Sequence, residues 1–356
     1  MKLKCLTRFL LLPALCFLLA GCESITYYSQ AILGQLSILS KREDIERLIE
    51  AESTPAPLKA KLQTILEIRQ FAASELGLPV TDSFDSYVEL ERPFVVWNVF
   101  ATPEFSMQPQ RWCYPVAGCV SYRGYFNETR ANRYAASLQA QGMDVYVGGV
   151  SAYSTLGWFS DPVLSTVINR EDYRLAELLF HELAHQLVYI PGDTEFNESF
   201  ATAVEQEGLR RWLAANDYSE IRSRQIIEEA RESSTRREQF VAMVSDTVKE
   251  LEALYDSDLD AQSKRQAKAE ILAAMRNTHT ILRQDWGGVS AYESWMSQAL
   301  NNAQLATVST YFNWVPAFEQ LLQEANHELP AFYAAVKDLQ AMDGASRKSF
   351  LEARMY

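Results

Sequence analysis

The chain has 356 residues, a hydrophobic share of 48% and a net charge of −13 at neutral pH. This length and apolar share are typical of a folded protein with two domains, or one large domain with an insertion, and exclude a disordered chain. The negative charge and the absence of a Lys/Arg cluster along the sequence exclude nucleic acid as an expected partner, because an acidic surface repels phosphate backbones.

The N-terminus has the features of a secretory signal. A short basic head precedes an apolar run, residues 9–19, that is too short to span a membrane. The run ends in Leu19-Ala20-Gly21-Cys22, which resembles the bacterial lipobox, so residues 1–21 are predicted to be a signal peptide and Cys22 to carry lipid. Glu23, rather than Asp, follows the Cys and favours the outer membrane, with the protein facing the periplasm. The alternative is an ordinary signal peptide with an accidental Cys.

Cys113 and Cys119 are the two cysteines that remain beyond Cys22. An oxidising compartment permits a disulfide across the short loop between them, which contains Pro and Gly. Two buried free thiols are the alternative. A metal site is not expected there, because no third and fourth ligand lie nearby in the sequence.

The first half of the chain is predicted to be helical and then β-rich. Apolar residues recur at helical spacing over residues 24–76, with an interruption near Thr54-Pro55-Ala56-Pro57. Strand formers dominate residues 93–164, apart from a helix expected over residues 127–141. Residues 22–92 are therefore expected to form an N-terminal helical segment.

Two helices are predicted to follow. Asn169 is expected to cap the first, which stops at Pro191-Gly192, and Asp193 to cap the second, which runs to about Ala215. Together with the β-rich stretch, they make up a segment over residues 93–217.

Two long charged helices over residues 218–255 and 259–284 are predicted to form an antiparallel hairpin, assigned to residues 218–286. Apolar residues lie on one stripe of the first helix, which favours a packing seam over a ligand groove. The members of this stripe are Phe240, Val244, Val248, Leu251 and Tyr255. Residues 287–356 are expected to form a C-terminal helical segment.

The chemistry is concentrated in His181-Glu182-Leu183-Ala184-His185. His181 and His185 are four residues apart, so their imidazoles share one helix face and can bind one zinc ion. Glu182 leaves the helix at a neighbouring angle and is expected to activate zinc-bound water as a base. A surface helix with two unrelated histidines is disfavoured, because an apolar run precedes the sequence.

A catalytic zinc site needs a third protein ligand and an open position. The candidate is Glu198, thirteen residues after His185 and early in the next helix. Asp193 and Glu195 are the alternatives, although both lie nearer the turn and capping explains Asp193 equally well. The Asn197-Glu198 pair also resembles the third-ligand helix of thermolysin-like zinc peptidases.

Several further segments occur together with this zinc-binding sequence: Tyr27-Tyr28, Gln30-Ala31, Gly34-Gln35, and the stretches Trp112 to Cys119, Asp144 to Val150, Ala152 to Phe159 and Phe180 to Gln186. With the lipobox, they resemble the family of bacterial lipoprotein aminopeptidases over nearly the whole chain after the signal. The resemblance implies a zinc-dependent peptidase of the gluzincin type, with His181, His185 and Glu198 as ligands and Glu182 as base.

One segment departs from the better-known gluzincin aminopeptidases. These have an upstream Gly-x-Met-Glu-Asn segment whose Glu holds the free substrate amine, whereas Gly148-Gly149-Val150-Ser151-Ala152 contains no carboxylate. Gly148, Gly149 and Val150 are instead expected to form an edge strand that pairs with the substrate backbone. A simple bulge or turn at the glycines is the alternative.

The mechanism also needs a donor for the tetrahedral oxyanion. The candidates are Tyr153, Tyr311, His279 and His327, with a surface position favoured for His279 and a buried structural role as the alternative for either Tyr. Glu205 shares a helix face with Glu198, and a surface charge is favoured for it over a contact near the metal.

The sequence thus predicts a mainly helical α+β metallopeptidase, zincin-like, with a small sheet beside the zinc-binding helix and a long helical hairpin. Its expected function is zinc-dependent peptide hydrolysis in the bacterial cell envelope, as an aminopeptidase. An endopeptidase for misassembled proteins or peptidoglycan crosslinks is one alternative. A non-catalytic zinc-containing scaffold lipoprotein is the other.

Overall fold

The computed structural model describes residues 27–355 except 115–117, 153–159, 217 and 309–313. The predicted signal peptide, the lipidation site Cys22 and the oxyanion candidates Tyr153 and Tyr311 lie outside the described residues. Among the described residues, no helix combines the length and hydropathy needed to cross a membrane.

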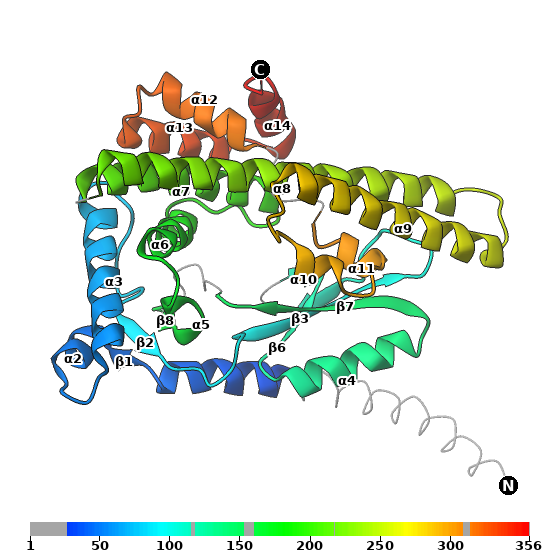
Figure 1. Cartoon of the computed structure of the whole chain (residues 1–356), viewed down its shortest axis with the longest axis horizontal. Coiled ribbons are helices and arrows are strands. Elements are labelled where there is room, and N and C mark those ends of the chain that lie inside the picture. Colours follow the sequence, from blue (N-terminus) through cyan, green and yellow to red (C-terminus); the bar gives the residue numbers. More distant parts are fainter. Residues whose placement is uncertain (1–26, 115–117, 153–159, 217, 309–313, 356) are drawn as a thin grey trace, which may run out of the picture.

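The fold is mainly helical with small sheets, as expected for the α+β class (Figure 1). After an N-terminal helix over residues 27–40, the helices are α2 Ile45–Glu50, α3 Ala56–Ser74, α4 Glu128–Gln139, α5 Ser165–Ile168, α6 Asp172–Leu187, α7 Thr194–Ala215, α8 Glu220–Tyr255, α9 Ala261–Asp285, α10 Glu293–Met296, α11 Asn302–Leu305, α12 Val315–Glu324, α13 Leu329–Ala341 and α14 Gly344–Glu352. The strands are β1 Glu43–Asp44, β2 Ser86–Val88, β3 Val96–Pro103, β4 Trp112–Tyr114, β5 Gly118–Val120, β6 Arg123–Tyr125, β7 Met143–Val150 and β8 Val163–Leu164.

The largest sheet has the antiparallel order β6-β3-β7, which makes β7 an edge strand. Ala131, Ala135 and Leu138 of α4 pack against Trp97 and other residues of this sheet. The short helix α11 also contacts β3 and β7, and Figure 1 shows it on the side of the sheet away from α4. The sheet is therefore held between helices, with the end of β7 pointing toward α5.

The N-terminal helix is attached to this sheet through its side chains. The Gln30 Nε2 donates to the Gly124 carbonyl at 3.2 Å, while its Oε1 accepts from the Phe126 amide at 3.2 Å. The Phe126 ring also lies so close to Gly34 that a Cβ there would be 2.2 Å from the ring. This contact explains why the helix has a glycine at that position.

The main core surrounds α6 and α7. Leu175, Leu179 and Phe180 of α6 and Phe196 and Phe200 of α7 are almost fully buried. The two helices make close contact along their length, with α3 and α12 packed around them. The sequence from His181 to His185 therefore lies on a helix whose position is fixed by packing on several sides.

The start of α6 differs from the sequence prediction. The helix begins at Asp172 after Glu171, while Asn169 ends the short helix α5, which the sequence did not reveal. It also ends at Leu187, before Pro191-Gly192. The cap of α7 is confirmed, because the Asp193 carboxylate accepts a hydrogen bond from the Phe196 amide at 3.2 Å.

The helical hairpin is formed by α8 and α9 along one long edge of the molecule (Figure 1). Phe240, Val244 and Leu251 of the predicted stripe are buried in a second core, which confirms the packing seam. His279 on α9 was expected at the surface, but it is only 4% exposed and its Nε2 lies 3.1 Å from the Ala291 carbonyl. Aromatic residues from the chain after α9 cover it, and the charged local sequence gave no sign of that contact.

Gly208 of α7 lies against the ring of Phe180 on α6. A Cβ at this position would lie 2.6 Å from the Phe180 ring and 2.9 Å from Leu76. We expect Gly208→Ala to lower the free energy of unfolding by about 1–3 kcal/mol, because overpacking outweighs the better helix propensity of Ala. Denaturant unfolding with Gly344→Ala as control measures this, since a Cβ at Gly344 meets no atom closer than 3.9 Å. A Gly208→Ala protein as stable as the control would contradict the expected crowding.

Candidate metal centre

Three side chains from α6 and α7 converge on one point. The Nε2 atoms of His181 and His185 are 3.2 Å apart. The Glu198 Oε2 lies 3.3 Å from the Nε2 of His181, and its Oε1 lies 3.7 Å from the Nε2 of His185. The ligand atoms of all three residues lie within 4.8 Å of one another. The fold thus brings together the three residues that the sequence singled out as metal ligands.

These separations fit a tetrahedral metal ion. Ligand atoms bound at about 2.0–2.1 Å with tetrahedral angles lie about 3.3 Å apart. The three measured distances lie close to that value, and the donor set of two imidazoles and one carboxylate is the one that catalytic zinc sites use. The residues present therefore fit zinc. Asp193 and Glu195, the alternative third ligands, are not part of the group.

Glu205 supports the centre from α7. Its Oε2 lies 3.0 Å from the Nδ1 of His181, the ring nitrogen on the far side from the cluster. The sequence favoured a surface charge for Glu205, and this interpretation is wrong. A carboxylate on the second nitrogen of a metal-binding histidine fixes the tautomer and orientation of the ring. Glu198 and Glu205 thus act on the same histidine from one helix.

Glu182 faces a cleft beside these residues. His181, Glu182 and Glu205 line the cleft, which has a volume of about 420 Å³, together with Arg170, Arg174 and Glu177. The Glu182 carboxylate and one candidate ligand, His181, are therefore open to molecules that enter the cleft. This arrangement matches a catalytic site more closely than a closed structural one.

The close packing of these groups shifts their pKa values. Burial disfavours charge on His181, but its hydrogen bonds to Glu198 and Glu205 raise its pKa to about 10. Burial and the neighbouring His181 lower the pKa of His185 to about 4. Burial raises the pKa of Glu182 to about 7, and the nearby carboxylates of Glu198, Asp161 and Glu205 add to this, although His181 opposes it. The carboxylates around His181 and His185 carry more negative charge than the two histidines neutralise. This excess favours a bound cation.

The end of β7 is linked to this cleft through Ser151, the residue that follows the strand. The Arg170 Nη2 lies 3.2 Å from the Ser151 Oγ, and the Thr166 hydroxyl donates to the Ser151 carbonyl at 2.5 Å. Gly149 is exposed, but a Cβ there would lie 2.3 Å from the Phe94 ring. Packing of Phe94 is therefore sufficient reason for that glycine.

The remaining predicted residues lie elsewhere. Cys113 and Cys119 are paired across the β4–β5 hairpin and joined by a disulfide. His327 has a half-exposed side chain whose Nδ1 is 3.7 Å from Glu207, and His279 belongs to the second core. Neither histidine lines the cleft.

Glu205→Gln keeps the shape of the side chain and removes its charge. We expect metal affinity to fall about 10–100-fold, as is typical when the partner of a metal-binding histidine is changed. A chelator competition titration measures the affinity, with Glu195→Gln on the same helix as control. Equal affinities in the two variants would show that the contact between Glu205 and His181 contributes nothing to binding.

The sequence was compared with models of known protein families, and one of them matches. The model of the family described as "Putative aminopeptidase" matches residues 26–351, nearly the whole chain. The chain belongs to this family, and membership indicates a hydrolase that acts on peptides. No curated protein and no solved structure matches the chain.

Proposed function

We propose that this protein is a zinc-dependent peptidase and that it removes residues from the N-terminus of peptides. The observation that carries the proposal is the convergence of His181, His185 and Glu198, with His181 and the neighbouring Glu182 lining an open cleft. Membership of the aminopeptidase family supports the same reaction class.

His181, His185 and Glu198 would hold the ion and leave one position open. A zinc ion in such a site polarises the scissile carbonyl and makes water more acidic. Glu182 accepts the proton of the attacking water and then donates it to the leaving amine. Glu205 holds the ring of His181 in place during the reaction.

The substrate backbone would pair with the free edge of β7. Gly148, Gly149 and Val150 lie at the end of this strand, next to Ser151, whose contact with Arg170 leads into the cleft. A peptide added to this edge would lie across the opening of the cleft.

We further propose that the protein is anchored in the bacterial envelope by lipid on Cys22, at the outer membrane and facing the periplasm. The lipobox-like Leu19-Ala20-Gly21-Cys22 supports the anchor, and the disulfide between Cys113 and Cys119 is compatible with an oxidising compartment. Cells of the producing bacterium grown with labelled palmitate are expected to label the parent protein and not Cys22→Ser. Labelling of this variant would contradict the lipid anchor.

The test of activity uses the chain from residue 22 with Cys22→Ser, which lacks lipid. Metal content is measured first, and hydrolysis of one peptide series is then followed with free and with acetylated N-termini. We expect zinc, hydrolysis of free N-termini alone, loss of activity with a chelator and recovery with zinc. Equal cleavage of acetylated peptides would show that the protein is an endopeptidase and not an aminopeptidase. If folded, zinc-loaded protein hydrolysed none of the peptides, the non-catalytic scaffold role would be favoured.

A further inference from the structure

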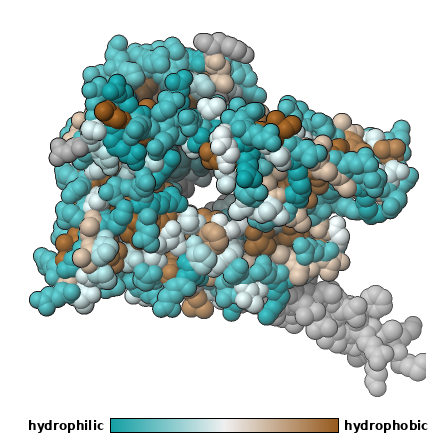
Figure 2. All heavy atoms as spheres, viewed as in Figure 1, coloured by the Kyte–Doolittle hydropathy of each residue, from teal (hydrophilic) through white to brown (hydrophobic). Residues whose placement is uncertain are grey.

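The cleft beside the candidate metal centre runs along one face of α6. Arg174, Leu178 and Glu182 line it at intervals of four residues, which places them in one row along the helix, and Arg170 lies just before the helix starts. The eight residues from Arg174 to Glu182 rise about 12 Å. Figure 2 shows a hollow near the centre of this face of the molecule, and Figure 1 places α6 beside it. The cleft is therefore long enough for several residues of a peptide.

The two ends of this cleft carry opposite charges. Glu182 and Glu205 line the end next to the metal ligands, whereas Arg170 and Arg174 line the end at the start of α6. The charge of Arg174 is neutralised within the protein, because its Nη1 lies 2.8 Å from an oxygen of Glu177, a residue that is only 7% exposed. Arg170 is therefore the residue that gives the far end of the cleft its positive charge.

The guanidinium of Arg170 is positioned but not neutralised. Its Nη2 donates to the Ser151 hydroxyl at 3.2 Å, and within the described part of the chain this is its one side-chain hydrogen bond, with no carboxylate at ion-pair distance. Glu171 and Asp172, which follow it, form ion pairs with other basic residues. The segment 153–159, shortly after Ser151, lies outside the described residues and contains no Asp or Glu. Most of the five N–H donors of the Arg170 guanidinium are therefore available to an acceptor in the cleft.

These charges would orient a peptide in the cleft. Because an aminopeptidase removes the first residue, its substrate extends away from the metal only on the C-terminal side of the scissile bond. Glu182 and Glu205 attract the positive amine of the substrate, whereas Arg170 repels it and attracts negative charge. A carboxylate at the Arg170 guanidinium would lie on the order of 10 Å from the metal end, which is the length of about three extended residues.

We propose that Arg170 binds a carboxylate of the peptide substrate, about three residues beyond the scissile bond on its C-terminal side. The inference rests on the proposed peptidase function and specifies its substrate class. The carboxylate is either the C-terminus of a short peptide or an Asp or Glu side chain at that position of a longer one. The hydrogen bond to Ser151 holds the guanidinium beside the end of β7, the strand whose edge would pair with the substrate backbone.

Calorimetric titration of peptides into zinc-loaded protein tests this contact. The chain from residue 22 carries Cys22→Ser and also Glu182→Gln, so that peptides bind without being hydrolysed. We expect tetraalanine to bind about 10–100-fold more tightly than its C-terminal amide, because the amide has no charge for the guanidinium. Arg170→Met is expected to remove this preference. Arg170→Lys is expected to keep part of it, since an ammonium retains the charge but not the bidentate geometry.

Two further peptides define the carboxylate. Dialanine and its amide are expected to bind equally, because the carboxylate of dialanine does not reach Arg170. The amide of a peptide with three alanines and a fourth residue Glu distinguishes the two sources of the carboxylate. If it binds as tightly as tetraalanine, Arg170 accepts an acidic side chain. If it binds as weakly as tetraalanine amide, Arg170 selects the C-terminus of a short peptide.

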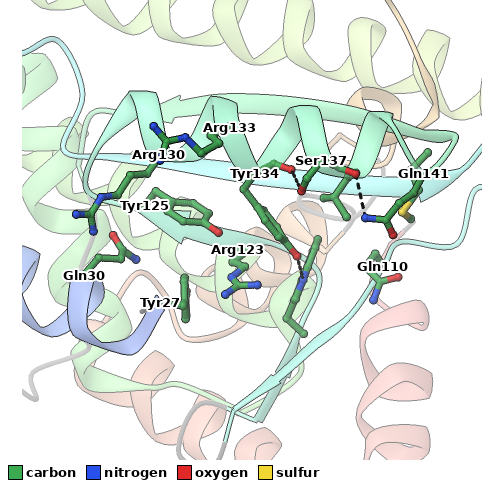
Figure 3. Close-up of a pocket in the computed structure, with 13 residues that line it drawn as sticks. Tyr27, Gln30, Gln110, Arg123, Tyr125, Arg130, Arg133, Tyr134, Ser137 and Gln141 are labelled. Atoms are coloured by element: carbon green, nitrogen blue, oxygen red, sulfur yellow. Dashed lines mark hydrogen bonds between the residues drawn. The ribbon is translucent and has the colours of Figure 1, made fainter. Parts of the chain in front are cut away.

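Arg133→Met is the matched control. Arg133 is an exposed arginine of α4 that lines a separate pocket of about 690 Å³ (Figure 3). This variant is expected to prefer tetraalanine over its amide as the parent does, and thermal unfolding verifies that all variants fold.

Three results would overturn the proposal. The first is that the folded parent binds tetraalanine no more tightly than its amide. The second is that Arg170→Met keeps the preference of the parent. The third is a preference already present with dialanine, which would place the carboxylate beside the metal. Because binding is measured without turnover, failure of the peptidase function appears separately, as absence of hydrolysis by protein with Glu182 intact.

Discussion

Glu182→Gln is expected to lower peptide hydrolysis by about three orders of magnitude and to leave the bound metal unchanged. The amide has the shape of the carboxylate but accepts no proton, and general acid–base catalysis contributes about 10²–10⁴-fold. Glu182 is not part of the ligand group of His181, His185 and Glu198, so metal content is expected to stay at the parental level. Initial rates with parallel metal analysis give both quantities.

Glu182→Asp serves as the companion variant. It retains a base but withdraws it by one methylene from the reacting water, and we expect an intermediate rate. If Glu182→Gln retained the activity of the parent, another group would have to take the proton and the assignment of the base would be wrong. If it lost metal as well, Glu182 would be a ligand.

Glu198→Ala is expected to lower metal affinity more than 100-fold and to abolish hydrolysis at ordinary metal concentrations. Removal of a ligand should exceed the about 10–100-fold cost of changing a residue behind a ligand. Glu195→Ala removes the same charge one turn earlier on α7 and is the matched control, expected to bind metal as the parent does. Chelator competition compares the two affinities. If Glu195→Ala lost metal and Glu198→Ala retained it, Glu195 rather than Glu198 would be the third ligand.

Local sequence rules predicted the elements that carry the candidate centre. The four-residue spacing of His181 and His185 requires a helix if both are to reach one ion, and α6 provides it. The Pro-Gly turn and the cap at Asp193 predicted the start of α7, which places Glu198 within one turn of its N-terminus. The spacing, the turn and the cap depend only on residues that are close in sequence. The elements that they define could therefore be predicted without a structure.

Contacts between distant segments could not be predicted in the same way. Glu205 shares a helix face with Glu198, but the sequence does not show that α7 lies against α6 over both turns. His279 lies in a charged helix, and Phe240 of α8 and Trp286 after α9 pack against it.

The long helix α8 contributes to the main core and to the second core. Near its start, Ile226 is buried with the residues around α6 and α7, while Phe240, Val244 and Leu251 further along are buried in the second core. Its 36 residues form one continuous helix about 54 Å long. Loss of either core would leave half of this helix without support, and an isolated half-helix is unstable in water. The two cores are therefore coupled thermodynamically, so the protein should melt as one cooperative unit and the hairpin could not be excised without unfolding the peptidase.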